Sequence, residues 1–384
     1  MTTTAGSRDD DDRRHPDRRP DAANGAFLLR GRGSTHMSEG GGDDDVESAG
    51  ETDGDELTYA DAGVDIDASE AATAALIGAV GSDPDAGDSA SDYAGMLDIG
   101  DRYLALATDG VGTKLLVAEA LGDYSTVGID CIAMNVNDLV AAGVRPVAFV
   151  DYLAVDEPDE RFAEQVGEGL SRGAELADIE LVGGETAVMP DVIQGLDLAG
   201  ACVGLAAKDG VFDGRAEPGD ALVGWRSAGI HSNGLTLARE AVTRDHDYAD
   251  ACPFDGYETL GEALLEPTAI YTDLLDPMRE HGVRGAAHVT GGGWTNLERL
   301  GENRYVIDDA FDPQPVFEFV QREGSVPDEE MYRTFNMGTG FVAALDPDAA
   351  EELAAETDGR VIGRVEERGE GGDGGSVAIR GLTL

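Results

Sequence analysis

Thr108-Asp109-Gly110-Val111-Gly112-Thr113-Lys114 joins an alternating apolar segment to a helical one, and no other stretch of the chain is as informative. The alternation over residues 103–108 predicts a β-strand, and residues 114–121 predict a helix. The two glycines allow a tight turn, and amides at the start of a helix can face a phosphate. Asp109 could hold magnesium and Lys114 could contact a phosphate, although the spacing is not that of a P-loop. Taken alone, the stretch also fits a plain strand–turn–helix junction.

A second helix is predicted over residues 129–142, and its few polar residues are informative. Asp130 and Asp138 are its only charged residues, and Asn137 precedes Asp138. Asp130 and Asn137 are seven residues apart, so a helix places them nearly on one face. Carboxylates on an otherwise apolar helix are unfavourable unless a metal or hydrogen bonds compensate them, and magnesium bridging ATP phosphates is a natural partner. The alternative is an acidic stripe that faces solvent.

Two loops that each join a predicted strand to a predicted helix resemble anion sites. Residues 227–234 and 290–294 offer flexible backbone together with hydroxyl or amide donors. His231 could be a general acid or base or a phosphate contact. Ser232 or Asn233 could equally serve only as a helix cap.

Two further segments carry polar groups next to strands. Residues 183–187 place Glu185 directly after a predicted strand, a common position for a ligand carboxylate, and the alternative is a turn with an exposed Glu. Residues 330–338 place Arg333 and several polar groups before another strand, without indicating what they contact.

The alternation of strand and helix patterns predicts an α+β fold of two domains. An N-terminal domain is expected over residues 57–212 and a C-terminal α/β domain over 213–384, because turn residues cluster at 213–220. No Rossmann glycine pattern occurs, so mixed sheets with helices on one face fit as well as a parallel sheet. Further strands are expected over residues 146–155, 180–182, 197–207, 221–226, 286–289, 304–307, 340–345 and 361–365. Further helices are expected over residues 159–177, 235–242, 268–280, 316–323 and 349–356.

Composition excludes some partners. The chain carries 27 basic and 78 acidic residues, a net charge of −51, which repels nucleic acids and anionic membranes. Only two lysines occur, and low lysine with an acidic surface indicates adaptation to a salt-rich cytoplasm, where salt screens the repulsion. The three cysteines are isolated and fit a reducing compartment, and no stretch is long enough to span a membrane. We therefore expect a cytoplasmic protein.

The first part of the chain differs from the rest. Residues 1–56 are rich in Gly, Asp, Ser, Thr and Arg and lack apolar periodicity, which predicts disorder. Residues 1–36 contain seven arginines and six aspartates, so the strongly acidic composition begins only near Met37. We hypothesise that Met37 is the true start of the protein.

Taken in order, these segments resemble the phosphoribosylformylglycinamidine cyclo-ligase family, also called aminoimidazole ribonucleotide synthetase. The resemblance covers about residues 57–384, and its specificity comes from eight motifs in family order. The motifs are Tyr59-Ala-Asp-Ala-Gly-Val-Asp-Ile-Asp67, Thr108-Asp-Gly-Val-Gly-Thr-Lys114, Gly128-Ile-Asp130, Asn135-Val-Asn-Asp138, Gly183-Gly-Glu-Thr186, His231-Ser-Asn-Gly234, Thr290-Gly-Gly-Gly293 and Met331-Tyr-Arg-Thr-Phe-Asn336.

The resemblance implies a homodimer whose N-terminal domains associate through their sheets, with ATP bound near that interface. It implies that formylglycinamidine ribonucleotide and ATP become aminoimidazole ribonucleotide, ADP and phosphate, a step of de novo purine biosynthesis. The formyl oxygen would be phosphorylated, and a nitrogen would then attack the same carbon as phosphate leaves.

The resemblance also implies roles for individual residues. Magnesium would be held by Asp109, Asp130 and Asp138. ATP and its phosphates would contact Asp109, Gly110, Gly112, Thr113, Lys114, Glu185 and Thr186. The ribonucleotide would contact His231, Ser232, Asn233, Thr290, Gly291, Gly292 and Gly293. The expected catalytic residues are His231, Lys114 and Asp109.

The chain departs from bacterial relatives at two positions. The glycine-dense loop of those relatives is represented by residues 91–100, where only Gly95 and Gly100 remain, and Ala60 stands where lysine is frequent. The shorter loop resembles the archaeal form. Two alternative functions are another ATP-using member of the same superfamily, such as thiamine-monophosphate kinase, and a nucleotide-binding regulator without catalysis.

Overall fold

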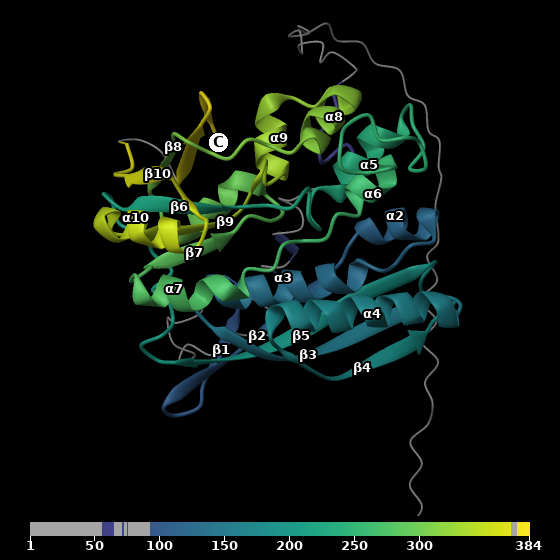
Figure 1. Ribbon diagram of the computed structural model, residues 1–384, viewed down its shortest axis with the longest axis horizontal. Helices are drawn as coiled ribbons and strands as arrows, with labels where there is room; N and C mark the ends of the chain where they lie inside the picture. The colour runs from purple at the N-terminus through teal and green to yellow at the C-terminus, as the bar shows by residue number, and fades with distance from the viewer. Residues whose placement is uncertain (1–55, 65–70, 73–74, 76–92, 370–374) are drawn as a thin grey trace, which may run out of the picture. The chain divides into compact units, whose positions relative to one another are not determined.

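The structure is a computed structural model that describes residues 56–64, 71, 72, 75, 93–369 and 375–384. Residues Asp53–Leu384 form one compact unit, and within the described part the strands form two sheets (Figure 1). This arrangement confirms the predicted α+β class. The expectations for the first 55 residues, including a start at Met37, lie outside the described residues. The boundary expected near residue 213 stays a prediction.

The first sheet has five strands in the order β1-β2-β5-β3-β4. Only β3 and β4 run parallel, so the sheet is mixed, as the sequence allows. Helices α3 and α4 cover one of its faces (Figure 1). The strands are β1 (Gly95–Asp98), β2 (Arg102–Gly110), β3 (Arg145–Val155), β4 (Glu180–Val188) and β5 (Leu196–Ala207), and the helices of this half are α2 (Lys114–Leu121), α3 (Val127–Ala141) and α4 (Glu160–Ala177).

The second sheet has seven strands in the order β12-β11-β8-β10-β6-β9-β7. It is also mixed, because β11 pairs with β8 in parallel and the other pairs are antiparallel. Its strands are β6 (Ala221–Arg226), β7 (Gly285–His288), β8 (Arg304–Ile307), β9 (Thr339–Leu345), β10 (Arg360–Glu366), β11 (Ser376–Ile379) and β12 (Leu382–Thr383). Its helices are α5 (Leu235–Thr243), α6 (Leu260–Leu264), η1 (Thr272–Leu274), α7 (Leu275–Glu280), η2 (Gly293–Leu300), α8 (Pro315–Gly324), α9 (Asp328–Thr334) and α10 (Pro347–Glu356).

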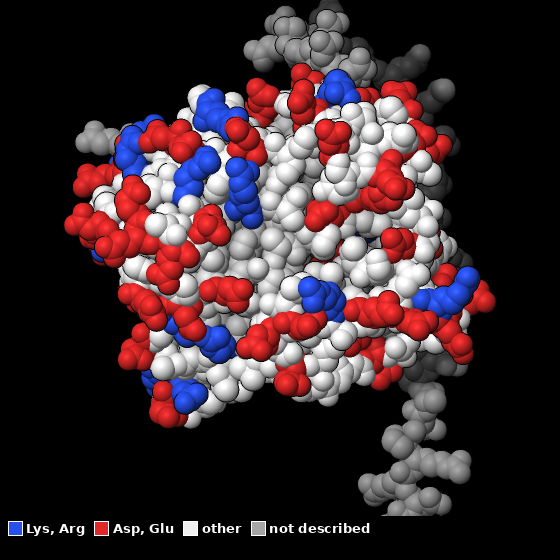
Figure 2. Space-filling model, viewed as in Figure 1, with Lys and Arg blue, Asp and Glu red and all other residues white. Residues whose placement is uncertain are grey.

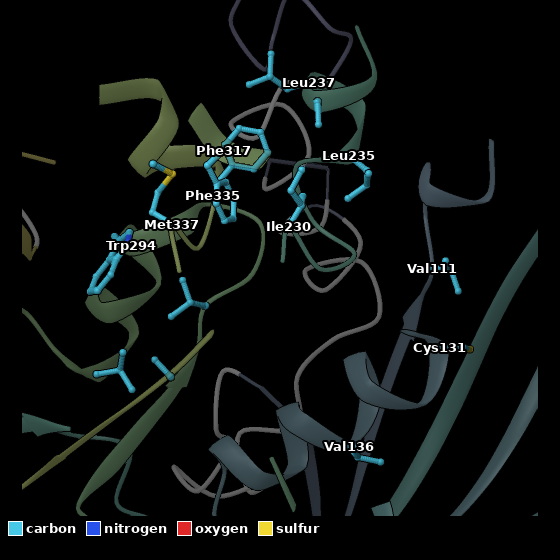
Figure 3. Close-up of a cluster of buried hydrophobic side chains, with 14 of the residues drawn as sticks. Val111, Cys131, Val136, Ile230, Leu235, Leu237, Trp294, Phe317, Phe335 and Met337 are labelled. Atoms are coloured by element: carbon cyan, nitrogen blue, oxygen red, sulfur yellow. The ribbon is translucent and has the colours of Figure 1, made fainter. Parts of the chain in front are cut away.

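Helix α3 lies where the two halves of the chain meet. It contacts β2, β5 and α4 of the first half and β7 and η1 of the second. Thirteen of its fifteen residues are buried, which explains its nearly continuous apolar sequence. One hydrophobic core also crosses this junction, because Val111 and Val136 belong to the same buried cluster as Ile230 and Phe335 (Figure 3).

Two sequence predictions about local structure are wrong. A single helix is predicted over residues 268–280, but residues 266–271 have no regular structure and the helical part begins with η1. The reason is that side chains of α3 bind the backbone of this segment. A strand is predicted over residues 180–182 only, but β4 continues through residues 183–187 and pairs with β3 as far as Val188. A Cβ atom on Gly184 would lie 2.2 Å from Asp151 Oδ1, so a larger residue there would displace the Asp151 side chain.

The surface is strongly acidic. Figure 2 shows Asp and Glu side chains spread over the visible face, with fewer Lys and Arg among them. In the described part of the chain, every helix is too short or too polar to cross a membrane.

Candidate active site

The phosphate loop predicted from the sequence lies against the first loop predicted to bind substrate. Ser232 Oγ donates to the carbonyl of Val111 at 3.2 Å. The Thr113 and Thr236 hydroxyl oxygens are 2.8 Å apart, and this hydrogen bond joins the start of α2 to α5. The structure therefore brings together residues that are more than 100 positions apart in the sequence.

The Thr290–Gly293 loop completes this group of loops. A Cβ atom on Gly291 would lie 3.3 Å from Asn233 Oδ1, so the two loops predicted to bind substrate are neighbours. Asn296 Oδ1 accepts from the Thr290 amide at 2.7 Å and fixes the end of the loop. Gly293 has a φ of 54° and packs so closely that a Cβ would lie 2.3 Å from the Tyr332 carbonyl oxygen. The backbone here accepts only glycine, as a loop that approaches a ligand closely requires.

Lys114 and Asp130 form a buried ion pair. Lys114 Nζ lies 2.9 Å from Asp130 Oδ1, and neither side chain has any exposed surface. Lys114 also donates to the Glu266 carbonyl, and Asp130 Oδ1 accepts from the amide and hydroxyl of Thr268 at 2.8 and 2.6 Å. Burial lowers the pKa of the Lys114 ammonium, and the charge of Asp130 opposes that shift. These contacts are those of a structural ion pair that joins the two halves and has no exposed surface. The second carboxylate oxygen, Asp130 Oδ2, has no hydrogen-bond partner among the described residues.

Asp109 and Asp138 form the opposite kind of site, because among the described residues neither carboxylate pairs with a lysine or an arginine. Burial, and then the charge of Asp138, raises the pKa of Asp109 to about 6. Asp109 Oδ1 accepts from the Gly110 amide at 2.7 Å, and Asp138 is one-fifth exposed. Repulsion between two acids in a partly buried site is relieved by a bound cation.

Sequence reasoning missed His288, a fully buried residue at the end of β7. Its Nδ1 lies 3.0 Å from Asp138 Oδ1, and its Nε2 lies 3.3 Å from Asn137 Nδ2. The ring therefore fixes the orientation of the Asp138 carboxylate, as imidazoles often do beside ligand carboxylates. The available signal was its place two residues before the Thr290 loop, at the end of a predicted strand.

Asn135 supplies a further oxygen beside Asp109. Its Nδ2 donates to the Asp109 carbonyl at 3.1 Å, and its fully buried Oδ1 has no hydrogen-bond partner among the described residues. Asp109, Asp138 and Asn135 can each offer a side-chain oxygen as a metal ligand, and oxygen is the ligand type that Mg²⁺ prefers. Within the described part of the chain, no group of three or more His, Cys, Asp or Glu side chains is placed to hold a metal. The donor set therefore fits an ion that takes its remaining ligands from phosphates and water.

His231 is a neutral, buried residue with a left-handed backbone, φ 69°. Its Nε2 accepts from the amides of Ala228 and Ala269 at 3.0 and 3.4 Å, which leaves the proton on Nδ1. Burial, with smaller effects from His288 and Lys114, holds its pKa well below the usual range. In this state the ring shapes its own loop, and its proton-accepting nitrogen is already occupied.

Glu185 and Thr186 are not brought to this group of loops. They lie on β4, the edge strand of the first sheet, and both are exposed. Glu185 is the register partner of Tyr152 and Thr186 that of Leu153.

The two halves of the chain match two family descriptions. Residues 91–206 match "AIR synthase related protein, N-terminal domain", and residues 217–374 match "AIR synthase related protein, C-terminal domain". These ranges contain nearly all of the first sheet and most of the second.

Solved structures share the fold at low sequence identity. "AaThiL complexed with AMPPCP and TMP" is 18% identical with a TM-score of 0.55, covering 78% of this chain and 90% of that one. "Crystal Structure of Hydrogenase Maturation Protein HypE in complex with ATP" is 19% identical with a TM-score of 0.52, covering 75% and 85%. "T. maritima PurL complexed with FGAR" is 17% identical with a TM-score of 0.53, covering 76% and 46%.

Relatives at much higher identity carry one name, phosphoribosylformylglycinamidine cyclo-ligase. The protein of Methanosarcina acetivorans is 48% identical over 322 residues, which span 82% of this chain and 96% of the relative. That of Methanocaldococcus jannaschii is 44% identical over 332 residues, 82% and 94% of the two chains. That of Pyrococcus furiosus is 46% identical over 314 residues, 77% and 90%. Both domains and almost the whole length of these relatives are matched, and the chain therefore belongs to the phosphoribosylformylglycinamidine cyclo-ligase family.

Proposed function

We propose that this chain closes the imidazole ring of formylglycinamidine ribonucleotide in an ATP-dependent reaction that yields aminoimidazole ribonucleotide, ADP and phosphate. The name shared by its relatives supports this activity. The single observation that carries it is the meeting of the Asp109 loop with the Ser232 and Gly291 loops beside α3. A nucleotide site next to a second substrate site is what a transfer between two ligands requires.

The proposed reaction has two steps. The formyl oxygen attacks the γ-phosphorus, the bond to the bridging oxygen breaks, and ADP leaves with that oxygen. The amidine-derived nitrogen then attacks the former formyl carbon, which expels the phosphorylated oxygen as phosphate after the nitrogen loses its proton. Neither step needs a protein nucleophile, so the enzyme contributes positioning and charge neutralisation.

Asp109, Asp138 and Asn135 would hold Mg²⁺ through their side-chain oxygens. Bound there, the ion would neutralise charge on the ATP phosphates. His288 would keep the Asp138 carboxylate in one orientation through the 3.0 Å contact at Nδ1. The backbone of Gly110, Gly112 and Thr113 would bind phosphate oxygens at the start of α2.

Lys114 and Asp130 receive a different role from the one that the resemblance implies. Their buried pair leaves no surface for a ligand, so we propose that they hold the phosphate loop against the Glu266 carbonyl of the second half. Glu185 and Thr186 are retained as ATP contacts. Their exposed position on the edge strand suits a site that a second subunit completes.

The ribonucleotide would bind to the Ser232, Asn233 and Thr290–Gly293 loops, whose small residues and amide groups suit a phosphate. His231 would shape this site, because its two accepted amide bonds fix the loop. A proton-accepting role for His231 is disfavoured in this arrangement, because Nε2 is already bound.

A homodimer formed through the first sheet is supported by its uncovered face. The face opposite α3 and α4 carries apolar side chains, and no helix of the described residues covers it (Figure 1). Exposed fractions on this face are 59% for Leu97, 50% for Leu106, 41% for Val150 and 45% for Tyr152. An apolar sheet face of this extent marks a protein interface, and a second copy offers a matching one.

The dimer is tested by light scattering behind a sizing column. Val150→Asp should convert a dimer of 40.0 kDa chains into monomers, because it buries a charge in the interface. Leu176→Asp on α4 is the matched control, since Leu176 is 44% exposed on the opposite side of the sheet. Equal masses for the two variants would contradict this interface.

The acidic composition also supports the proposal that the protein is adapted to a salt-rich cytoplasm, where salt screens the repulsion between its acidic residues. Thermal unfolding of the full chain should then shift to higher temperature as KCl rises from low to molar concentration. A melting temperature that does not respond to KCl would contradict this proposal.

The activity is tested with the full chain in high salt. ADP and aminoimidazole ribonucleotide are measured with ATP and Mg²⁺, with and without formylglycinamidine ribonucleotide. Equal amounts of both products, formed only with the ribonucleotide, are expected. ATP binding without ribonucleotide-dependent turnover would favour a kinase of the same superfamily or a nucleotide-binding regulator.

A further inference from the structure

The segment of residues 266–271 is held to α3 at two points, one on each side of Ala269. At the first point, Thr268 donates its amide and its hydroxyl to Asp130 Oδ1, at 2.8 and 2.6 Å. At the second point, Asn137 Oδ1 accepts from the Tyr271 amide at 2.9 Å, and Asn137 Nδ2 donates to the Ala269 carbonyl at 2.8 Å. These contacts take the backbone groups that a helix would need, which is why the segment is extended.

The same segment is bonded to the loop that carries the predicted substrate residues. The Ala269 amide donates to His231 Nε2 at 3.4 Å. Tyr271 Oη donates to the carbonyl of Arg226, the residue directly before that loop, at 2.8 Å. Residues 266–271, which we call the splint, are therefore fixed on α3 on one side and bonded on the other side to His231 and to the residue that precedes its loop.

We infer that Thr268 is a positioning residue for this enzyme: its hydroxyl fixes the splint on Asp130, and the splint sets the His231 loop against the carboxylates of α3. The inference rests on the proposed function for its kinetic consequences. The contact geometry itself can be tested without turnover.

The structure shows why the hydroxyl matters more for position than for folding. Thr268 is 2% exposed, so water does not replace its bond to Asp130. Without the hydroxyl, Asp130 Oδ1 still accepts from the Thr268 amide and remains paired with Lys114 Nζ. The buried charge therefore stays compensated, and the main loss is one short hydrogen bond that defines where the splint lies.

Thr268→Val tests the inference, because valine keeps the shape and removes the hydroxyl. Thr268→Ser is the rescue variant, because it keeps the hydroxyl. Thr357→Val is the matched control: Thr357 lies in the same half, and its hydroxyl also forms hydrogen bonds, with Trp225 Nε1 and the Leu353 carbonyl. Thr268→Ala carries the same test if the valine variant does not fold.

Ribonucleotide-dependent ADP release should fall about tenfold in kcat for Thr268→Val, with the KM for ATP within about twofold of the wild type. Thr268→Ser should retain at least half of the wild-type kcat, and Thr357→Val should lose thermal stability without losing kcat. A Thr268→Val enzyme with wild-type kcat, or a serine variant as slow as the valine variant, would overturn the inference.

A second readout uses ¹⁵N-histidine spectra of the full chain and does not depend on activity. His231 should show the Nδ1–H tautomer in the wild type, and its Nε2 resonance should shift in Thr268→Val while His246 and His281 keep theirs. An unchanged His231 resonance would overturn the inference. A wild type without ribonucleotide-dependent turnover would instead refute the proposed function and leave this spectroscopic test intact.

Discussion

Two acidic residues near the junction, Asp130 and Asp109, differ in how the chain compensates them. Asp130 is fully buried, paired with Lys114 and bonded to Thr268. Asp109 is partly buried and has another carboxylate, Asp138, as its charged neighbour, which together with burial raises its pKa to about 6. The two sites use the same kind of side chain in opposite electrostatic settings.

The difference separates structural charges from functional ones. A buried carboxylate compensated within the chain contributes to the native arrangement, and removing its partner is strongly destabilising. A carboxylate pair without an internal counter-charge keeps the folded protein less stable than it could be, which natural selection retains where a ligand supplies the missing charge. By this criterion Asp109 and Asp138 are the residues that would bind the metal ion of the phosphate site, and Asp130 has a structural role.

The largest expected effect follows from breaking the compensated pair. Lys114→Met should lower the free energy of unfolding by about 3–5 kcal/mol, because it leaves the Asp130 charge buried without a partner. The midpoint of denaturant unfolding in high salt measures this loss. A Lys114→Met/Asp130→Leu double variant should recover most of it, and a double variant as unstable as the single one would contradict the compensation described here.

Removing the carboxylate of Asp109 should lower activity without lowering stability. Asp109→Asn should lower ribonucleotide-dependent ADP release by about 100-fold or more, because it removes a carboxylate charge that would hold the Mg²⁺ neutralising the ATP phosphates. Steady-state kinetics at saturating ATP measure this loss. An Asp109→Asn enzyme with more than a tenth of the wild-type rate would refute the ligand role.

Separating His288 from Asp138 should have an intermediate effect. In His288→Gln the side-chain amide can still approach Asn137 but no longer Asp138, so activity should fall about 10- to 100-fold. His288→Asn is the matched control, since its amide can take the place of Nδ1 and should retain more activity. Equal losses in the two variants would contradict an orienting role for the 3.0 Å contact with Asp138.

The smallest expected effect is a gain in stability from Asp109→Asn. The pKa of Asp109 is raised from 3.8 to about 6, so ionised Asp109 destabilises the folded state above pH 6, and this penalty shrinks as pH falls toward 3.8. Asparagine should therefore raise the free energy of unfolding by about 3 kcal/mol at pH 7 and by much less near pH 4. Denaturant unfolding of both proteins across this pH range measures the gain, and a gain that is independent of pH would contradict its assignment to the Asp109 charge.

The sequence predicts the framework of the molecule well, because strand alternation and helical periodicity reflect burial that the structure preserves. The helix over residues 114–121 and the strands over 221–226 and 304–307 have the predicted bounds. The seven-residue spacing of Asp130 and Asn137 also places both on the side of α3 that meets residues 266–271.

The failures have physical causes that no local pattern encodes. Residues 268–280 favour a helix locally, but tertiary hydrogen bonds from α3 determine the backbone of the first four of them. Asp130 and Asp138 have equal charges in the sequence, and only the fold shows that Lys114 neutralises the first and His288 orients the second. The site residues therefore stay predictions at the level of individual roles.

Manganese binding tests the central distinction most directly. Mn²⁺, a paramagnetic substitute for Mg²⁺, is titrated with a non-hydrolysable ATP analogue into the wild type, Asp109→Asn and the Lys114→Met/Asp130→Leu double variant, and electron paramagnetic resonance reports the free ion. Loss of Mn²⁺ affinity in Asp109→Asn, with a much smaller loss in the folded double variant, is the predicted result. Retained affinity in Asp109→Asn together with loss in the double variant would show that Asp130 is the ligand and that the account is wrong.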